Sequence, residues 1–458
     1  MDRYDVVIVG AGIGGLMAAY GLKARNSGLK IAIVDKGRMI DKRVCPSSSG
    51  GSCRHCNAGC SITSGFAGAG AFSDGKYNLG TSYGGTLGEE IGEETAIGYI
   101  MAADEILNCF VPNGVFIKTY GTNESLKTKC LQNNLQLLDM NVKHYGTDNN
   151  FEIMSSLIQW LQNHYVDMFA STWITNIERE NDGSYTLYCH DRHFSSNKVI
   201  LATGRNGADF IQKICNQFEI QVESNAVDIG VRVEMKDAIW REFSSQIYEP
   251  KILCRTKTFE DKTRMFCFNQ GGIVSAENNG GVITANGHAF SDADKKTDNC
   301  NFAILSSIVF TEPFNDPTTY AKSFSAMANL IGDGNVLVQR FGDLIRGRRT
   351  NESRLAKNTV RPTLKATAGD LSLALPHRIL TNIIETIYAL DSVAPGTAND
   401  DTLLYGLESK YYSIKPVHDK NFMIHDGIYL IGDGAGVARG LSQSAAMGLY
   451  VADKITEI

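Results

Sequence analysis

Three glycines near the N-terminus have the spacing of a phosphate-binding turn. Gly10, Gly12 and Gly15 follow four apolar β-branched residues at 6–9 and precede an apolar helical stretch. Gly10 permits a tight turn, Gly12 lets the backbone approach a pyrophosphate, and Gly15 lets the following helix pack closely on the strand. The N–H groups at the start of that helix face the phosphates. This turn, with Gly14 inside it, is therefore predicted to bind a dinucleotide.

An acidic residue stands where an adenosine ribose needs an acceptor. Asp35 ends the next apolar strand, 20 residues after Gly15. A carboxylate in this position accepts hydrogen bonds from the ribose hydroxyls. The adjacent Lys36 is predicted to be a further cofactor contact. A glycine motif alone is weak support for such a site, but here strand, helix, strand and acid all occur in register.

A second glycine-rich segment lies more than 400 residues later. Residues 427–436 form an apolar strand that runs into Gly432 and Asp433 and then into a small-residue helix containing Ser442. In flavoenzymes of the glutathione-reductase type, a late strand of this kind closes the site and its Asp binds the ribityl chain. The two segments together predict FAD, with the late helix N-terminus facing the pyrimidine edge of the flavin.

Two further stretches are predicted to line the flavin. The isoalloxazine ring needs close backbone approach, and N–H groups near its N1 and O2 stabilise the anionic reduced form. Residues 64–76 are rich in glycine, and the strand at 198–204 ends in small residues that pass under the cofactor. The predicted contacts from these stretches and from the strand at 173–178 are Gly68, Ala69, Gly70, Ser73, Asp74, Ile174, Thr203 and Gly204.

Four of the 11 cysteines are bunched within 16 residues, at Cys45, Cys53, Cys56 and Cys60. In a cytosolic chain, such bunching favours metal or redox chemistry over structural disulfides. Four thiolates could hold zinc or an iron–sulfur cluster, and a Cys-x-x-Cys pair could be a redox disulfide. The spacing matches no standard pattern closely, so reduced cysteines without a ligand stay a third possibility.

Composition places the chain among ordinary globular proteins. Of 458 residues, 43% are hydrophobic and 21% are charged, which leaves room for two or three domains. The net charge of −6 provides no broad basic field for nucleic acid or an anionic membrane. We find no leader peptide and no uninterrupted apolar segment able to span a bilayer, so a cytoplasmic location is expected.

The elements that must position these residues form an interrupted α/β pattern. We predict an FAD-binding Rossmann-like domain of glutathione-reductase type, interleaved with an α+β substrate domain. The FAD domain is assigned to 1–80, 150–206 and 421–458, a helical segment to 81–149, and the substrate or cap domain to 207–420. Helices are expected at 154–165, 302–310, 320–331 and 379–390, and strands at 185–189, 228–234, 265–268 and 281–285.

Several short blocks spread over nearly the whole chain form a family pattern. They are Arg43-x-Cys-Pro46, Cys53-x-x-Cys56, the string from Ser64 to Lys76, Val227–Glu234, Phe266–Asn269, Gly271-Gly272, Asn286-Gly-His288, Arg361-Pro-Thr363 and Gly432–Gly436. With these blocks the chain resembles a family of largely uncharacterised bacterial FAD-dependent dehydrogenases, related to the two-dinucleotide-binding-domain flavoproteins. It departs from the family after Glu408 and at Arg439-Gly440, both in segments that the resemblance implies to face the substrate.

The resemblance implies an FAD-dependent dehydrogenase or reductase acting on a small molecule. FAD exchanges a hydride at N5 while a polar residue moves the accompanying proton, so a C–C or C–N bond is dehydrogenated or reduced. His288 and Cys267 lie in matched blocks and are candidates for proton transfer, and Lys76 for a positive charge beside the ring. Isolated His and Cys residues are more often structural, and Lys76 could be a solvated turn residue. The run Arg346–Arg349 could bind a carboxylate or phosphate but is by default a solvated loop.

Two other functions remain open. Some RNA-modifying flavoproteins share this FAD domain, although the acidic balance weighs against nucleic acid as a partner. A flavin and iron–sulfur electron-transfer protein would use the four cysteines. No second Gly-x-Gly-x-x-Gly segment is obvious in 207–420, so a separate electron donor or acceptor is expected.

Overall fold

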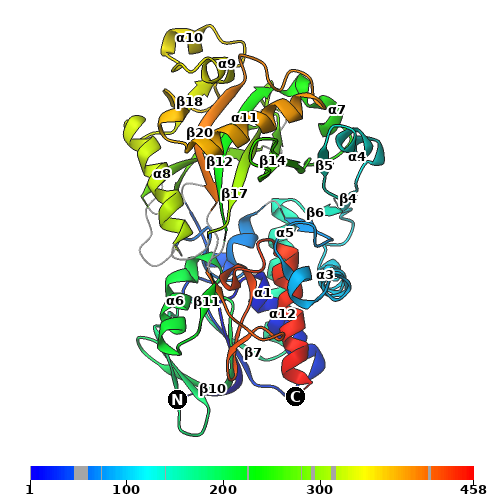
Figure 1. Cartoon of the computed structure of the whole chain (residues 1–458). Helices are drawn as coiled ribbons and strands as arrows, with labels where there is room; N and C mark the ends of the chain where they lie inside the picture. Colours follow the sequence, from blue (N-terminus) through cyan, green and yellow to red (C-terminus); the bar gives the residue numbers. More distant parts are fainter. Residues whose placement is uncertain are drawn as a thin grey trace. The chain divides into compact units, whose positions relative to one another are not determined.

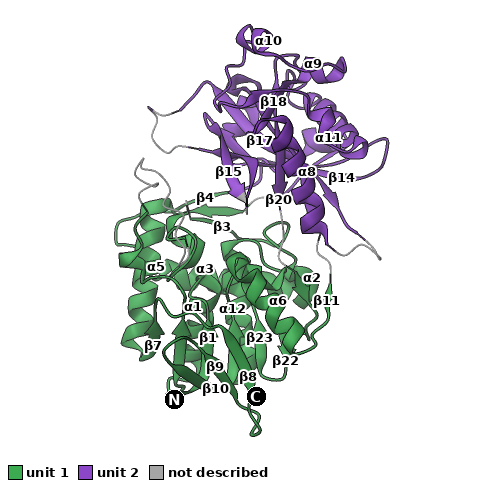
Figure 2. Cartoon of the chain, turned by 90° about the vertical axis from the view of Figure 1, so that its left-hand side faces the viewer, with its two compact units in different colours: residues 1–120, 140–223, 413–458 green, residues 121–139, 224–412 purple. Residues whose placement is uncertain are grey.

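The computed structural model describes residues 2–45, 60–73, 75–139, 141–223, 226–279, 281–289, 294, 296–310, 316–410 and 414–457. The chain folds into two compact units, coloured separately in Figure 2. Unit 1 comprises 1–120, 140–223 and 413–458, and unit 2 comprises 121–139 and 224–412. The predicted helical segment 81–149 is therefore divided between the two units.

A largely parallel sheet forms the centre of unit 1 (Figure 1). Its strands lie in the order β22-β23-β10-β1-β2-β7, and β1 pairs in parallel with both β2 and β10. Residues 6–9 are buried, as their unbroken apolar run requires of a strand covered on both faces. The strands are β1 (Asp2–Val9), β2 (Ile31–Val34), β7 (Val166–Phe169), β10 (His193–Leu201), β22 (Met423–His425) and β23 (Ile428–Leu430), with β8 (Asn176–Arg179) and β9 (Tyr185–Tyr188) joined to β10. The α/β fold class is confirmed.

Helices α1 (Ile13–Arg25) and α12 (Leu441–Thr456) pack closely on each other beside this sheet (Figure 1). The approach depends on small residues, because a Cβ on Gly448 would lie 2.3 Å from the Gly14 carbonyl oxygen. The other helices of unit 1 are α2 (Leu87–Ile91), α3 (Glu93–Asn108), α5 (Thr147–Asn163) and α6 (Ala208–Gln217). Its remaining strands are β3 (Lys76–Asn78), β4 (Lys118–Tyr120), β6 (Val142–His144), β11 (Val222–Glu223) and β21 (Lys415–Pro416).

Unit 2 is built on an eight-stranded, almost wholly antiparallel sheet in the order β19-β18-β20-β12-β17-β14-β13-β5. The strands are β5 (Leu135–Leu137), β12 (Val227–Lys236), β13 (Ile252–Arg255), β14 (Lys262–Gln270), β17 (Asn299–Ile308), β18 (Leu337–Arg340), β19 (Thr367–Ala368) and β20 (Leu403–Lys410). A separate hairpin pairs β15 (Ile273–Asn279) with β16 (Val282–His288). The helices are α4 (Glu124–Leu131), α7 (Arg241–Ser244), α8 (Pro317–Ile331), α9 (Phe341–Ile345), α10 (Glu352–Ala356) and α11 (His377–Asp391).

Two sequence predictions of local structure are corrected. The helix expected at 302–310 is wrong, because β17 occupies 299–308 between β12 and β14. Phe302–Leu305 are buried in this central strand, and an apolar run covered on both faces has no periodicity that separates strand from helix. The strand expected at 173–178 is β8, which begins only at Asn176, so Ile174 lies before it.

Candidate functional site

The predicted phosphate-binding turn has the geometry that its glycines require. Gly10 adopts a φ of +108°, and a Cβ there would lie 2.3 Å from the Ala202 carbonyl oxygen. A Cβ on Gly15 would lie 2.1 Å from the Gly10 carbonyl oxygen, so α1 can follow β1 closely only without a side chain. Gly12, at the N-cap of α1, differs from both, since no described atom lies within 4 Å of the Cβ position. The turn thus leaves open space at the residue predicted to admit a pyrophosphate.

The Asp35 carboxylate is tied to this turn. One oxygen accepts a hydrogen bond from the Ala11 N–H at 2.8 Å and the other accepts from the Gly37 N–H, also at 2.8 Å. Each carboxylate oxygen keeps a further lone pair, so a ribose hydroxyl can still donate to it. The adjacent Lys36 donates to the Asn206 carbonyl oxygen at 3.3 Å and lies over the Trp173 ring. Their cofactor contacts remain predictions.

The glycine-rich segment passes beside the turn and reaches the start of α12. Gly68–Phe72 form a short 3₁₀ helix, η3, and a Cβ on Gly68 would lie 3.0 Å from the Gly12 Cα atom. A Cβ on Gly70 would lie 2.9 Å from the Leu441 side chain, at the first residue of α12. The predicted contact Ala69 lies between them in η3, and Asp74 lies outside the described residues. Two segments far apart in the sequence therefore meet in unit 1.

Arg43 secures the segment that leads into η3, a role that the sequence reasoning missed. This nearly buried guanidinium donates to the carbonyl oxygens of Ser61, Ile62 and Phe66 at 3.0, 2.8 and 2.6 Å. Burial lowers the pKa of Arg43 to about 10, against the raising effect of the Asp35 charge. Its membership of a family block was the available signal, but the sequence could not show that its partners would be carbonyl groups.

The late strand brings Asp433 to the same part of unit 1. After β23, Gly432–Ala435 form η8, and the Asp433 Oδ2 atom lies 2.9 Å from the Arg205 Nη2 atom. A Cβ on Gly434 would lie 3.3 Å from the Gly204 carbonyl oxygen, so η8 packs against the end of the 198–204 segment. The second Asp433 oxygen remains available to a hydroxyl donor. Arg205 was not predicted as part of this site.

Two predicted cofactor residues have buried hydroxyl groups without protein partners. The Thr203 and Ser442 side-chain oxygens are buried, and neither makes a hydrogen bond within the part of the chain that the structure describes. Buried polar groups in native proteins nearly always have a partner. Gly12 leaves open space, and the N-cap residue Gly440 provides no side-chain cap for the first N–H groups of α12. Together with these features, the two hydroxyls fit an FAD that binds along η3 and η8.

A strap at 83–87 covers the segment before α12 and was also missed by the sequence reasoning. The Thr86 N–H donates to the Val437 carbonyl oxygen at 2.9 Å, and the Arg439 N–H donates to the Gly84 carbonyl oxygen at 2.7 Å. The buried Gln443 side chain adds a bond to the Tyr83 carbonyl oxygen at 3.2 Å. Arg439, where the sequence departs from the family pattern, therefore lies at the contact between the strap and the segment before α12.

Replacing Asp433 by alanine should weaken FAD retention about ten- to a hundredfold. A hydroxyl bond to a charged acceptor is worth about 1.5–3 kcal/mol, and about 1.4 kcal/mol is a factor of ten in affinity. Arg205→Ala is the matched control, because the half-exposed ion pair with Asp433 is worth about 0–1 kcal/mol. FAD affinity is measured by titrating the apoprotein. Equal losses in the two variants would mean that Asp433 only pairs with Arg205. Asp74→Ala is expected to change turnover or flavin potential more than retention.

The family blocks of unit 2 converge on one buried polar cluster around Arg232. The guanidinium, 0% exposed, pairs with Glu408, also 0% exposed, through Nε–Oε2 and Nη2–Oε1 distances of 2.8 and 3.0 Å. It also donates to the Cys267 carbonyl oxygen at 2.9 Å and to the Asn286 side chain at 3.0 Å. Asn269 donates to the same Cys267 carbonyl oxygen at 3.0 Å. Residues from three separate family blocks and Glu408 are thus brought together.

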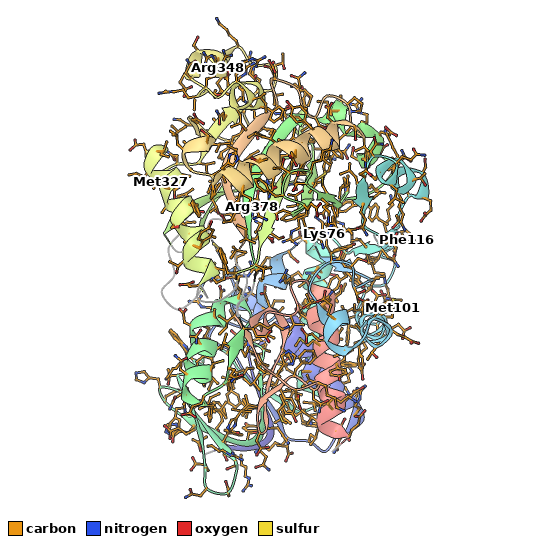
Figure 3. The ribbon with its side chains drawn as sticks, in the orientation of Figure 1. Lys76, Met101, Phe116, Met327, Arg348 and Arg378 are labelled. Carbon is orange, nitrogen blue, oxygen red and sulfur yellow. The ribbon has the colours of Figure 1, made fainter. Side chains whose placement is uncertain are left out.

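Cys267 has an unusual backbone conformation inside this cluster. Its φ is +55°, at a register shift of β14 between Phe266 and Asn269. The Cys267 N–H donates to the Glu249 carboxylate at 3.0 Å, so both of its peptide groups are held by buried side chains. His288 is exposed at the end of β16, two residues after Asn286. The third catalytic candidate, Lys76, begins β3 in unit 1 and is labelled in Figure 3.

The arginine-rich loop after α9 has protein partners. Arg346 pairs with Asp400 at 2.7 Å, and Arg348, labelled in Figure 3, pairs with the buried Asp343 at 2.8 Å. These contacts favour the structural interpretation of the run 346–349 over an anion-binding site.

The four-cysteine prediction falls mostly outside the described residues. Cys53 and Cys56 lie there, whereas Cys45 and Cys60 are described. Burial tends to raise the pKa of the Cys60 thiol, but bonds from Ile62 and Thr63 and the Arg43 charge outweigh it and lower the pKa. Among the described residues, no group of three or more His, Cys, Asp or Glu side chains could hold a metal ion. A zinc or iron–sulfur site at these cysteines remains a prediction.

None of the described helices is long and apolar enough to cross a membrane.

Comparison with known proteins agrees with this site. Residues 5–54 match the family described as FAD binding domain, and residues 226–411 match FAD-dependent protein, C-terminal domain-like. An uncharacterised protein from Clostridium beijerinckii is 23% identical over 98% of this chain and 80% of its own length.

Solved structures similar to the chain include glycine oxidase from Geobacillus kaustophilus, at 11% identity and a TM-score of 0.39 over 100% of this chain and 95% of that one. L-proline dehydrogenase from P. horikoshii has 12% identity and a TM-score of 0.40 over 100% and 94%. The FrdA protein of E. coli quinol fumarate reductase has 14% identity and a TM-score of 0.42 over 100% and 71%.

One family match, over residues 5–54, includes the glycine turn, and the other, over residues 226–411, includes the polar cluster of unit 2. They confirm FAD as the predicted cofactor and the predicted relationship to FAD-dependent proteins. The chain is an FAD-dependent oxidoreductase that carries an FAD binding domain together with the C-terminal domain of FAD-dependent proteins.

Proposed function

We propose that this oxidoreductase moves a hydride between N5 of its FAD and a C–C or C–N bond of a small organic substrate. In the oxidative direction the substrate loses a hydride from carbon and a proton from the neighbouring carbon or nitrogen, and a double bond forms between those atoms. A separate electron donor or acceptor completes the cycle. The protein must bind the substrate, exclude water and move the proton.

The observation that carries this proposal is the topology of unit 2. Its large sheet is antiparallel apart from the two-residue pairing of β18 with β19. A nucleotide-binding domain needs parallel strands joined by a helix behind a glycine-rich turn. The described part of unit 2 contains no such arrangement. The topology therefore favours a small-molecule substrate over an NAD(P)H bound by a second dinucleotide domain.

Cys267 and His288 are the proposed proton-transfer residues, and Lys76 the proposed positive charge near the ring. A non-glycine residue at positive φ costs about 1–3 kcal/mol and persists only where its surroundings hold it. At Cys267 those surroundings are Arg232, Asn269 and Glu249, which bind the backbone on both sides of the thiol-bearing residue. Such support is expected where the position of one side chain matters for function.

Anaerobic reduction of the holoenzyme tests the proposal. Amino acids and saturated carboxylic acids are added in turn, and the visible flavin absorbance is followed. One class should bleach the flavin with a saturable rate, and the unsaturated product should restore the colour of the reduced enzyme. Rapid, saturable bleaching by NADH or NADPH with no response to any organic class would contradict a small-molecule hydride donor.

The same assay tests the proposed proton-transfer residues, because the bleaching rate reports catalysis and the FAD content reports folding. Cys267→Ala and His288→Gln should lower the bleaching rate about 10²–10⁴-fold, which is typical of lost acid–base catalysis. Their FAD content should stay unchanged. Cys109→Ala, at an exposed cysteine of unit 1, is the matched control and should bleach at the normal rate. Normal rates in both test variants would remove these residues from the mechanism.

A further inference from the structure

The side chain of Asn286, on β16, links the two segments that carry the proposed proton-transfer residues. Its Oδ1 atom accepts a hydrogen bond from the Arg232 Nη2 atom at 3.0 Å, and the Arg232 Nη1 atom donates to the Cys267 carbonyl oxygen at 2.9 Å. Both acceptors therefore lie against one buried, planar guanidinium. Since His288 follows Asn286 by two residues on the same strand, Arg232 connects the Cys267 segment with the His288 segment.

The Asn286 amide is fixed in orientation by contacts at both of its ends. Besides the bond from Arg232, its Oδ1 atom accepts from the Gly287 N–H at 2.8 Å, and its Nδ2 atom donates to the Glu277 carboxylate on the neighbouring strand β15. An amide that turned over would set its oxygen against this carboxylate and its N–H groups against the guanidinium. All three bonds would then be lost, so a single orientation of the amide is stable.

Two glycines allow the β15–β16 hairpin to lie directly on the polar cluster. A Cβ on Gly287 would lie 2.3 Å from the Asn269 Nδ2 atom. A Cβ on Gly272 would lie 2.6 Å from the His288 carbonyl oxygen and 2.7 Å from the Asn269 Cβ atom. The end of β16 therefore packs against the residues next to Cys267 with no space for a further side chain, and these contacts fix the backbone of His288.

The Arg232 guanidinium has no N–H group left for a substrate. An arginine has five N–H donors, and each of them has an acceptor here. Two acceptors are the oxygens of Glu408, and the others belong to Cys267, Asn286 and Asn301. Because all of its donors are used inside the protein, Arg232 orients its neighbours and does not bind a ligand.

We propose that Asn286 is a positioning residue that, through Arg232, holds His288 at a fixed place relative to Cys267. The assignment rests on the proposed proton-transfer roles of these two residues. Proton transfer depends on distance and direction, and a displacement of about 1 Å can slow a reaction about 10²-fold. The guanidinium suits such placement, because its N–H groups form a rigid fork.

Replacing Asn286 by alanine tests this placement directly. The imidazole resonance of His288 is recorded by NMR for the holoenzyme and is assigned from its loss in His288→Gln. The resonance should move and broaden in Asn286→Ala, because the strand that carries His288 loses the three hydrogen bonds of the amide. An unchanged resonance in a folded variant would overturn the proposal.

A second variant and a control keep this test decisive. If Asn286→Ala does not fold, Glu277→Ala replaces it, because the exposed Glu277 binds only the Nδ2 end of the amide. A smaller change in the His288 resonance is expected, and no change would count against the proposal. Asn278→Ala is the control on the same hairpin, where the Asn278 side chain accepts from the Gly281 N–H at 2.9 Å. Its His288 resonance should equal that of the unmodified protein.

The bleaching assay determines whether this placement serves the reaction. With the amino acid or carboxylic acid that bleaches the unmodified holoenzyme, Asn286→Ala should lower the limiting rate about ten- to a hundredfold. The half-saturating concentration should stay unchanged, because the amide acts on His288 and not on substrate binding. A normal limiting rate in a variant whose His288 resonance has moved would remove Asn286 from the mechanism.

The two measurements also separate this proposal from the proposed function. The resonance depends on the protein alone, so a failure to find any substrate would leave the placement of His288 by Asn286 standing. A normal bleaching rate in His288→Gln would remove His288 from the proposed function, and the effect of Asn286 on the resonance would then have no catalytic meaning.

Discussion

Replacing Gly12 by alanine should leave the protein folded and weaken FAD binding about ten- to a hundredfold. No described atom lies within 4 Å of the new methyl group, so the apoprotein has room for it. The predicted pyrophosphate needs the same space, and forcing an extra methyl group into a close-packed contact costs about 1–3 kcal/mol. About 1.4 kcal/mol is tenfold in affinity. FAD titration and thermal unfolding of the apoprotein measure the two effects separately.

Gly98→Ala is the matched control for this prediction. Gly98 is exposed in helix α3, and its Cβ position also has no described atom within 4 Å. Alanine in a helix interior is favoured over glycine by about 0.5–1 kcal/mol, so this variant should be slightly more stable with normal FAD affinity. Gly15→Ala should behave differently from both, since its methyl group would meet the Gly10 carbonyl oxygen and disturb the fold. Normal FAD affinity in Gly12→Ala would place the phosphates elsewhere.

Replacing Glu408 by leucine should destabilise unit 2 by about 3–5 kcal/mol. Arg232 and Glu408 are both completely buried, and removing one partner leaves an uncompensated charge in the interior. Lys410, 3.2 Å from Glu408, would lose its partner as well. Urea unfolding followed by fluorescence measures the loss. Arg346→Ala, at an exposed pair with Asp400, is the control and should change the free energy of unfolding by less than about 1 kcal/mol.

The double variant Arg232→Met with Glu408→Leu distinguishes stability from positioning. Replacing both members of a buried pair by apolar residues is often close to neutral, so much of the lost stability should return. The Cys267 carbonyl oxygen would still lack the Arg232 donor, so reduction of the flavin by the substrate should stay slow. Recovery of both stability and turnover would show that Arg232 matters only as the partner of Glu408. A double variant no more stable than Glu408→Leu would contradict the ion-pair argument.

The dinucleotide turn could be predicted from the sequence because its physics is local. Gly10, Gly12, Gly15 and Asp35 lie within one strand–helix–strand unit, where chain geometry alone places the glycines near the acid. Asp433 could be predicted from a second local pattern. FAD as the cofactor and the α/β class therefore followed from residue type and spacing.

The polar cluster of unit 2 could be anticipated only as a set of unconnected blocks. The cluster draws its members from four strands, namely Arg232, Cys267, Asn286 and Glu408. Only the pairing of these strands in the sheet and the hairpin shows that the Arg232 guanidinium binds the other three residues. The strand at 299–308 was mistaken for a helix for a related reason. A central strand is defined by its neighbours on both sides, which an apolar run by itself does not reveal.

The sequence by itself determined the cofactor, the glycine turn after β1 and the class of fold, since each depends on contacts between residues close in the chain. Only the tertiary structure decided that Arg43 holds the segment leading into η3, that Arg205 pairs with Asp433 and that Asn150 donates to the Gly70 carbonyl oxygen. These are hydrogen bonds between elements far apart in the sequence. Whether a buried donor meets a carbonyl group, a carboxylate or a cofactor depends on how those elements pack, and no local pattern of residues encodes that outcome.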